Sequence, residues 1–422
     1  MISEKELNKK SKFLINLLYI IITILPFSLI TGPFIPDLSI TLVGLFFLFL
    51  SIRYNLRKYY TSNFSIFFLI FYVVLNFTSF FSVDIIQSFK ISFVYFRYFL
   101  FSLAVWFLIE VKKDLLKNLL KSISIAMCIL IIDGFYQFYF GKNILGWEII
   151  DTRVSSFFKD ELILGSYLSR IFPIFFALCI LNFKSFFQKK INFFLIFFLL
   201  SGIEILTFLS GERAAFFYIN LSAIYLVILM RDFKLLRLFT LCFSFIVIFI
   251  ITNINSVYKE RIVDQTIKQI DSGEHIYIFS EEHTNHYFSG YKMFQDNKIT
   301  GIGPRMFRAN CHLDKYKTSF ESCTTHPHNN YIQILTESGL LGIIIFIIPF
   351  GFLIYYSIKH FILKFIFKKT FFSDFQLSLM SCFLITLWPL VPTGDFYNNW
   401  LNIIYYFPLG IFLASLDKSL KL

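Results

Sequence analysis

Blocks of roughly 17–22 mostly apolar residues recur along the chain, and a helix of that length crosses a hydrocarbon layer of about 30 Å. Only 16% of the residues are charged, whereas soluble domains carry about a quarter. The mean hydropathy of +0.68 agrees with a chain that needs an apolar solvent as well as water. We therefore expect an all-α, polytopic membrane bundle of about twelve transmembrane helices. The expected spans are 13–31, 38–52, 64–81, 91–109, 118–140, 165–183, 191–209, 214–230, 235–252, 338–357, 375–392 and 400–417.

Basic residues gather in alternate short loops between these spans. If the N-terminus is cytoplasmic, each such loop lies inside, as the positive-inside rule requires. We therefore expect a multi-pass protein of the bacterial inner membrane with both termini in the cytoplasm. The net charge of +12 is then a topology signal, and no nucleic-acid partner is expected. The clusters include Lys9, Lys10 and Lys12; Arg53, Arg57 and Lys58; Lys112, Lys113, Lys117 and Lys121; Arg231, Lys234 and Arg237; and Lys359, Lys364, Lys368 and Lys369.

The outer segments are unequal in length, which divides the chain into three parts. Residues 1–252 form a bundle of about nine spans, 253–337 a large periplasmic loop with short helices, and 338–422 about three further spans. The loop holds most of the histidines, and loops carry function more often than the elements they connect. A transporter built from two six-helix halves would have its long connection after the sixth span and inside. A lipid-oligosaccharide flippase or transporter is therefore the less favoured class.

The stretch from Thr324 to Gly342 contains the first candidate site. Pro327 suits the first position of a helix that Thr325 or His326 would cap and Gly339 would end. His328 would then lie in the first turn, where the helix dipole disfavours an imidazolium. A neutral imidazole can act as a general base, although a capping or packing histidine remains the alternative. Asn330, Gln333 and Glu337 would form the polar face of the helix.

Two arginine-bearing turns are candidate anion sites. Arg213 follows Ser210-Gly211-Glu212 at the N-terminus of the eighth span, where helix N–H groups already attract anions. An ion pair with Glu212 or contact with lipid head groups is the alternative there. In the turn from Thr300 to Arg308, backbone N–H groups together with Arg305 and Arg308 could cradle phosphate oxygens.

Other charged residues lie in outer loops or in the outward halves of spans. Arg97 and Arg170 fall inside spans, where an arginine is costly and usually has a partner or lines a cavity. Asp133, Glu204 and Asp395 are the expected partners. Asp37 is a turn residue in the first outer loop, with catalysis as the lesser alternative. Further cations on this side are Lys90 and Arg153.

The large loop also offers histidines and cysteines. His283, His286, His326 and His328, with Cys311 and His312, could form a zinc site, but their spacings fit no standard framework. We expect instead that Cys311 and Cys323 form a disulfide in the oxidising compartment, worth about 3 kcal/mol by the loop-entropy estimate. No metal and no cofactor is expected.

The stretch beginning at His328 resembles the signature of the O-antigen ligase and polymerase family. It has His328-Asn329, nine residues, Gly339, two residues and Gly342, preceded by His326-Pro327. The resemblance extends to the hairpin at Arg213, the turn 301–307, and the loop from Arg153 to Ser166. Residues 1–100 resemble the family only in hydropathy.

The resemblance implies a metal-independent, inverting membrane glycosyltransferase with a periplasmic active site. Its donor would be a glycan on undecaprenyl diphosphate, and its acceptor lipid A–core for a ligase or a second lipid-linked repeat unit for a polymerase. We expect a ligase, with the polymerase as the alternative, and membrane lipids as further partners. His328 would be the catalytic base, while Arg213, Arg305 and Arg308 would bind the donor diphosphate. Secondary site residues would be His326, Asn329, Arg153, Arg97 and Glu337.

Overall fold

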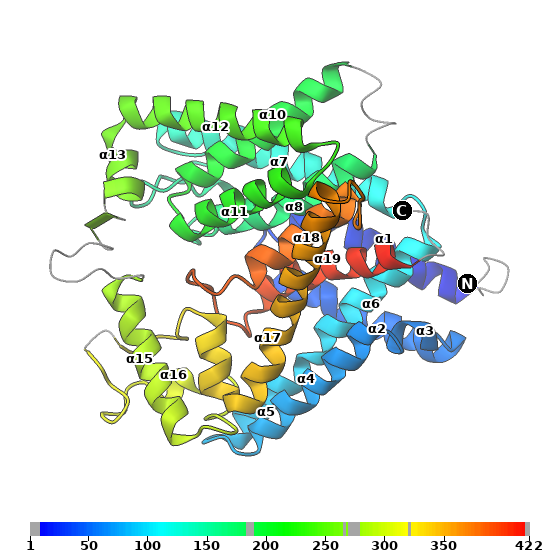
Figure 1. Cartoon of the computed structure of the whole chain (residues 1–422), viewed down its shortest axis with the longest axis vertical. Coiled ribbons are helices and arrows are strands. Elements are labelled where there is room, and N and C mark those ends of the chain that lie inside the picture. The colour runs from blue at the N-terminus through cyan, green and yellow to red at the C-terminus, as the bar shows by residue number, and fades with distance from the viewer. Residues whose placement is uncertain (1–8, 183–189, 265–266, 269–278, 320–321, 418–422) are drawn as a thin grey trace.

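The computed structural model describes residues 9–182, 190–264, 267–268, 279–319 and 322–417, and these form an all-α bundle (Figure 1). Each of the twelve expected spans coincides with an apolar helical segment. Eight of these segments are long and apolar enough to cross a membrane, and the others are shorter. They are α1 (Lys9–Ser28), α2 (Phe34–Tyr54), α4 (Asn63–Ser79), α5 (Ile85–Val94) with α6 (Phe96–Val111), α7 (Leu115–Phe140), α8 (Leu164–Leu181), α10 (Lys190–Leu209), α11 (Arg213–Leu229), α12 (Lys234–Ile254), α17 (Asn330–Phe365), α18 (Asp374–Thr386) and α19 (Asn399–Leu416).

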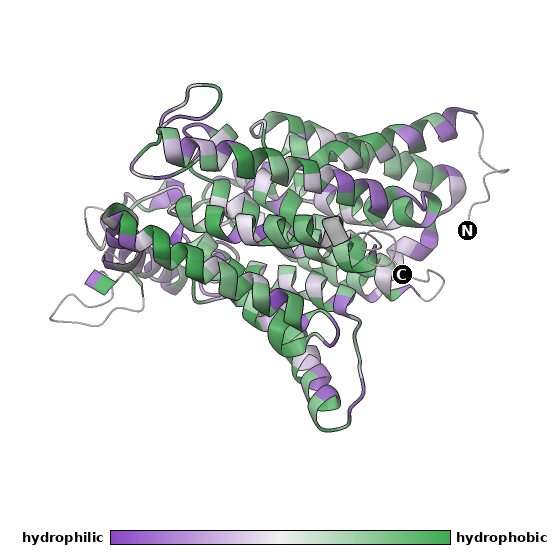
Figure 2. Ribbon diagram, turned by 90° about the horizontal axis from the view of Figure 1, so that it is seen from above, coloured by the Kyte–Doolittle hydropathy of each residue, from purple (hydrophilic) through white to green (hydrophobic). Residues whose placement is uncertain are grey.

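Successive segments alternate in direction, so the bundle has two distinct ends. The start of α1 and the end of α19 lie at one end, which we call the termini end (Figure 1). The opposite loop end carries α13 (Ser256–Lys259), η2 (Glu260–Asp264), α15 (Glu281–Asp296) and α16 (Phe307–Asn310). Hydrophilic residues gather toward the two ends and hydrophobic residues cover most of the helix lengths, as a membrane-embedded bundle requires (Figure 2). The smaller elements are α3 (Arg57–Tyr60) and η1 (Ser156–Phe158).

The helix expected around His328 begins later than the sequence indicated. Asn329, and not Thr325 or His326, is its N-cap, and its side-chain oxygen accepts the N–H groups of Tyr331 and Ile332. Pro327 is therefore not in the helix, and His328 lies just before the cap. The expected break at Gly339 is present, because this residue has non-helical backbone angles and kinks α17.

The kink is stabilised by the glycine turn at residues 301–303. At the kink, the carbonyls of Thr336 and Glu337 have no N–H donor from the helix itself. They accept hydrogen bonds from the N–H groups of Ile302 (3.0 Å) and Gly303 (2.9 Å) instead. In the same way, Leu340 and Leu341 donate to carbonyls at residues 298 and 299. A Cβ on Gly301 would lie 2.5 Å from the Glu337 backbone, so only glycine allows this approach. The turn thus fixes the direction of α17 at the loop end.

The charged residues inside spans have other partners than expected. Arg97 pairs with Asp37 (2.8 Å) rather than with Asp133, Glu204 or Asp395. Arg237, which the sequence placed in a basic inner loop, is fully buried in α12 and forms an ion pair with Glu204. Its long side chain reaches inward from the first turn of the helix, so a position near a helix end did not imply exposure.

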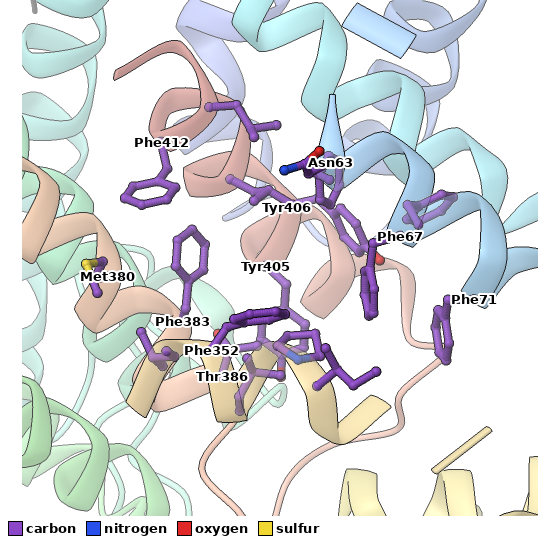
Figure 3. Close-up of a pocket in the computed structure, with 18 of the residues that line it drawn as sticks. Asn63, Phe67, Phe71, Phe352, Met380, Phe383, Thr386, Tyr405, Tyr406 and Phe412 are labelled. Atoms are coloured by element: carbon purple, nitrogen blue, oxygen red, sulfur yellow. The ribbon is translucent and has the colours of Figure 1, made fainter. Parts of the chain in front are cut away.

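An apolar cavity of about 670 Å³ lies between α4, α6, α17, α18 and α19. Aromatic side chains from these helices line it, including Phe67, Phe352, Phe383 and Phe412 (Figure 3). Its lining includes Asn330 at the start of α17 and Asp417 after the end of α19. The cavity therefore extends along the bundle between the loop end and the termini end.

Candidate functional site

Four histidines from two separate segments meet at the loop end. His283 and His286 come from α15, one turn apart, and His326 and His328 from the segment before α17. The ring centroid of His328 lies 4.2 Å from that of His326 and 5.3 Å from those of both α15 histidines. The sequence had considered these residues together only as a zinc site. In the described ranges, no three His, Cys, Asp or Glu side chains have an arrangement that could hold a metal ion.

His328 is half-buried at the centre of this cluster. Burial, reinforced by the neighbouring imidazoles, lowers the pKa of His328 to about 3, because both disfavour the positive charge of the imidazolium form. Within the described part of the chain, neither ring nitrogen of His328 has a hydrogen-bond partner. The residue also has a left-handed backbone (φ 52°), and such strain concentrates at functional sites. The side chain is therefore a neutral imidazole, and its unprotonated ring nitrogen remains able to accept a substrate proton.

The segment between α18 and α19 holds the histidine segment in place. Thr393 accepts from His326 Nε2 (3.2 Å) through its carbonyl and donates its N–H to the His328 carbonyl (2.8 Å). Asn329 donates its side-chain amide to the carbonyl of Pro389 (2.8 Å). Burial lowers the pKa of His326, so it too is neutral. Because both its ring nitrogens contact protein oxygens, His326 positions the segment, whereas His328 is left for a ligand.

Arg305 and Arg308 converge on one carboxylate of the same segment. Asp395 lies 3.5 Å from Arg305 Nε and 3.6 Å from Arg308 Nη2, and both arginine side chains remain 36% exposed. Its other oxygen accepts from Gln333 Nε2 (2.7 Å) on the polar face of α17. Long single contacts to a shared acid leave most guanidinium donors open, so the two arginines can still bind an anion.

The backbone part of the expected phosphate cradle at residues 300–308 is not formed. The N–H groups of Ile302 and Gly303 bind α17, and that of Phe307 binds the Glu337 carboxylate (3.0 Å). These donors are committed to the kink, so the arginine side chains are the part of the turn that can contact an anion. Glu337 is fully enclosed by these bonds and by Gln333, which makes it a structural anchor.

Arg213 is the first residue of α11 and lies near the histidine cluster. Its charge contributes to the lowered pKa of His283, although burial is the larger cause, so the two groups are near each other. Glu212 does not pair with it. Its carboxylate instead accepts from the backbone and hydroxyl of Ser166 at the start of α8 (2.6 Å for the hydroxyl). This bond fixes the turn that presents Arg213.

Two more arginines flank this turn. A Cβ on Gly211 would lie 2.8 Å from Arg261 Nε and 2.9 Å from Arg153 Cγ, so a bare glycine backbone lets both side chains pack there. Arg153 donates to the carbonyls of Ser210 (3.0 Å) and Leu162 (2.8 Å). Burial lowers the pKa of Arg153, and the charge of Arg261 adds to the effect. The turn is therefore a concentrated cationic surface.

Some expected site residues lie apart from the histidines. Arg97 is held by Asp37 (2.8 Å) and Asn399 (2.7 Å), which assigns it to the packing of α2, α6 and α19. Cys311 and Cys323 are joined by a disulfide with their Cα atoms 4.9 Å apart. The bridge lies between the Arg308 turn and the His326 segment.

Sequence reasoning missed Asp395 as the acid between the two arginines, and it grouped His283 and His286 with His328 only as possible zinc ligands. Asp395 was noticed only as a partner for arginines inside spans. A charged residue in the short polar loop 393–398 could have indicated a functional residue, but the partner of that residue is set by tertiary packing. The histidine spacing in α15 placed two imidazoles on one helix face without indicating what they face.

Residues 193–347 match the sequence model of a family described as O-antigen ligase. The match includes Arg213, Arg305, Arg308 and all four clustered histidines. It ends before Asp395. No curated protein matches the chain.

Proposed function

We propose that the chain transfers a glycan from undecaprenyl diphosphate to lipid A–core, because residues 193–347 match the model of a family described as O-antigen ligase. The reaction would occur at the periplasmic face of the inner membrane, by a metal-independent inverting mechanism. The single observation that carries this proposal is His328, a neutral imidazole with unbonded ring nitrogens at the centre of the histidine cluster.

In the proposed mechanism, His328 takes the proton of the acceptor hydroxyl as its oxygen attacks the anomeric carbon. The bond from that carbon to the diphosphate breaks, and the leaving group carries away the electron pair. Arg213, together with Arg305 and Arg308, would neutralise the departing charge, as a metal does in other transferases. Positioning two bulky lipids then supplies much of the rate, since the diphosphate is already a good leaving group.

The apolar cavity supports a lipid-linked substrate. Asn330, which lines it, is the second residue after His328, so a hydrocarbon chain in the cavity would carry its head group to the histidines. The aromatic lining suits an isoprenoid or acyl chain rather than a sugar.

A repeat-unit polymerase is the second candidate, because it needs the same donor and the same base. The two differ in the acceptor. Purified protein in nanodiscs should transfer glycan from undecaprenyl diphosphate to lipid A–core in the presence of chelator. Extension of a second donor molecule instead would establish the polymerase. A chain that moves the intact donor between leaflets, and forms neither product, would be a flippase and would refute the proposal.

A further inference from the structure

Arg170, in the second turn of α8, is a buried cation without an acidic partner. The residue is only 5% exposed, and none of the described carboxylates forms an ion pair with it. Its Nη1 donates to the carbonyl of Ser166 in its own helix (3.2 Å), and its buried Nε has no hydrogen-bond partner. Two aromatic rings enclose the guanidinium, those of Tyr218 (5.1 Å) and Tyr405 (5.9 Å).

The carboxylates that the sequence offered as partners are all engaged elsewhere. Asp133 accepts from the Ser156 hydroxyl (2.5 Å), Glu204 pairs with Arg237, and Asp395 lies between Arg305 and Arg308. An arginine inside a membrane span is costly and normally pairs or lines a functional cavity. Cation–π contacts and one carbonyl satisfy only part of a guanidinium that has five N–H donors. A negatively charged ligand would complete it.

The position of Arg170 relative to the candidate site indicates which negatively charged ligand it could bind. Ser166, which accepts from Arg170, also binds Glu212, the residue before Arg213. Tyr218 donates its hydroxyl to the carbonyl of Pro392 (3.3 Å), in the segment that carries Asp395. Arg170 is therefore linked through Ser166 to the turn that presents Arg213, and through Tyr218 to the segment whose Asp395 contacts Arg305 and Arg308.

The apolar cavity adjoins the same guanidinium. Tyr405, whose ring contacts Arg170 on one side, also lines the cavity (Figure 3). Arg170 does not itself line the cavity, so the phosphate of a lipid whose chain occupies it would reach the guanidinium past the ring of Tyr405.

We propose that Arg170 binds a phosphate group carried by a lipid in this cavity. The inference rests on the proposed function in taking a lipid-linked phosphate as the anion. A donor diphosphate, a phosphate on a lipid A-type acceptor and an ordinary phospholipid share this chemistry. The planar fork of Arg170, walled by Tyr218 and Tyr405, would hold two phosphate oxygens at once.

The test is binding of undecaprenyl diphosphate to the full chain in detergent, with undecaprenol as the uncharged probe. We expect Arg170→Met to weaken undecaprenyl diphosphate about tenfold to a hundredfold, the range for hydrogen bonds to a charged group. Binding of undecaprenol should not change. Lipid A and phosphatidylglycerol are measured in parallel, and the probe whose affinity depends on Arg170 identifies the source of the phosphate. Equal affinity of wild type and Arg170→Met for all three phosphate lipids would overturn the proposal.

Arg237→Met is the matched control, because Arg237 is equally buried, stacks on Phe172 (4.6 Å), and has a carboxylate partner. Its loss orphans Glu204, so the melting temperature should fall while phosphate-dependent binding persists. Arg170→Met orphans no acid, so the melting temperature without ligand should stay unchanged or rise. A purely structural Arg170 would give the Arg237 pattern, which refutes the proposal.

Arg170→Lys keeps the cation if the methionine variant does not fold. It should still bind undecaprenyl diphosphate more tightly than undecaprenol, but by a smaller ratio than wild type. An unchanged ratio would refute the proposal. Binding is measured without turnover, so the two proposals can fail separately. Arg170-dependent binding without glycan transfer would refute the proposed function alone, and transfer with Arg170-independent binding would refute this inference alone.

Discussion

The loop end and the contact between α10 and α12 differ in whether a buried arginine has an acidic partner. Arg237 and Glu204 face each other there, and Ser244 adds a hydrogen bond to the same carboxylate (2.5 Å). At the loop end, Arg170 has no acid, and Arg305 and Arg308 share Asp395 at long distances. The arginine between α10 and α12 is closed, meaning that a carboxylate pairs with it directly. The arginines at the loop end are open, because they keep N–H donors available for a ligand.

This difference separates scaffold from site more clearly than polarity does. Both regions contain buried arginines, and the sequence alone indicated only that an arginine inside a span is energetically costly. A closed pair stabilises the fold against separation of its helices, while an open cation is tolerated because a ligand completes it. We therefore expect substitutions at the loop end to reduce transfer with little effect on stability, and substitutions between α10 and α12 to do the reverse.

The largest effect should come from His328→Ala. A general base contributes about 10²–10⁴-fold, so transfer should fall by that factor while donor binding and melting temperature stay close to wild type. Turnover and donor affinity are measured on the same nanodisc preparation. Near-normal turnover would remove His328 as the base.

Two histidine controls sharpen this result. His360 is buried in α17 with both ring nitrogens bonded, to the Leu229 carbonyl (3.2 Å) and the Phe372 N–H (3.1 Å). His360→Ala should lower stability and leave turnover per folded molecule unchanged. His326→Ala should be milder than His328→Ala, because His326 positions the segment through Thr393.

The next largest effect concerns the closed pair. Glu204→Gln leaves Arg237 buried without a counter-charge, and breaking such a pair destabilises by about 3–5 kcal/mol. Thermal or denaturant unfolding in detergent measures this loss, and KM and kcat should not change. The double variant Glu204→Gln/Arg237→Met removes both charges and should recover most of the stability. A double variant as unstable as the single one would contradict the account of the pair.

A smaller effect is expected from Arg213→Lys. Lysine keeps the charge but loses the planar fork, so transfer should fall about tenfold with normal amounts in the membrane. The loss should appear mainly in donor affinity, which binding of undecaprenyl diphosphate measures. Wild-type affinity and transfer would assign Arg213 to lipid anchoring or topology.

The sequence was sufficient for the bundle because each span is long, apolar and separated from the next by polar residues. Length and hydropathy are local properties, so most spans lie within about four residues of their expected bounds. The exceptions are α17, which extends eight residues beyond 338–357 at each end, α18, which ends six residues before 392, and α5, which begins six residues before 91. The break at Gly339 could also be predicted, since glycine alone allows its backbone there. The cap could not, because Asn329 rather than Thr325 or His326 is fixed by contacts with Pro389, sixty residues later.

Partners across the bundle were the least predictable part of the site. Arg97 was expected to pair with Asp133, Glu204 or Asp395, and instead pairs with Asp37. The turn at residues 300–308 has the residues of a phosphate cradle, yet its N–H groups bind α17. Residue type indicates what a group can bind, but only packing decides whether a helix or a ligand takes it.

The smallest expected effect is that of mild acid. An ordinary imidazole of pKa 6.5 is about three-quarters protonated at pH 6, which would remove most activity of a general base. Burial lowers the pKa of His328 to about 3, so kcat/KM should change less than about twofold from pH 7.5 to 5.5. Stability should respond instead. The pKa values of His283 and His326 are lowered too, so below pH 6.5 the unfolded chain binds protons that the folded chain does not, and the melting temperature should fall toward pH 3. The residual activity of His328→Ala over the same range corrects for ionisation of the substrates. An acid limb near pH 6.5 that is absent from this variant would show that His328 titrates as an exposed imidazole, and would contradict the lowered pKa of His328.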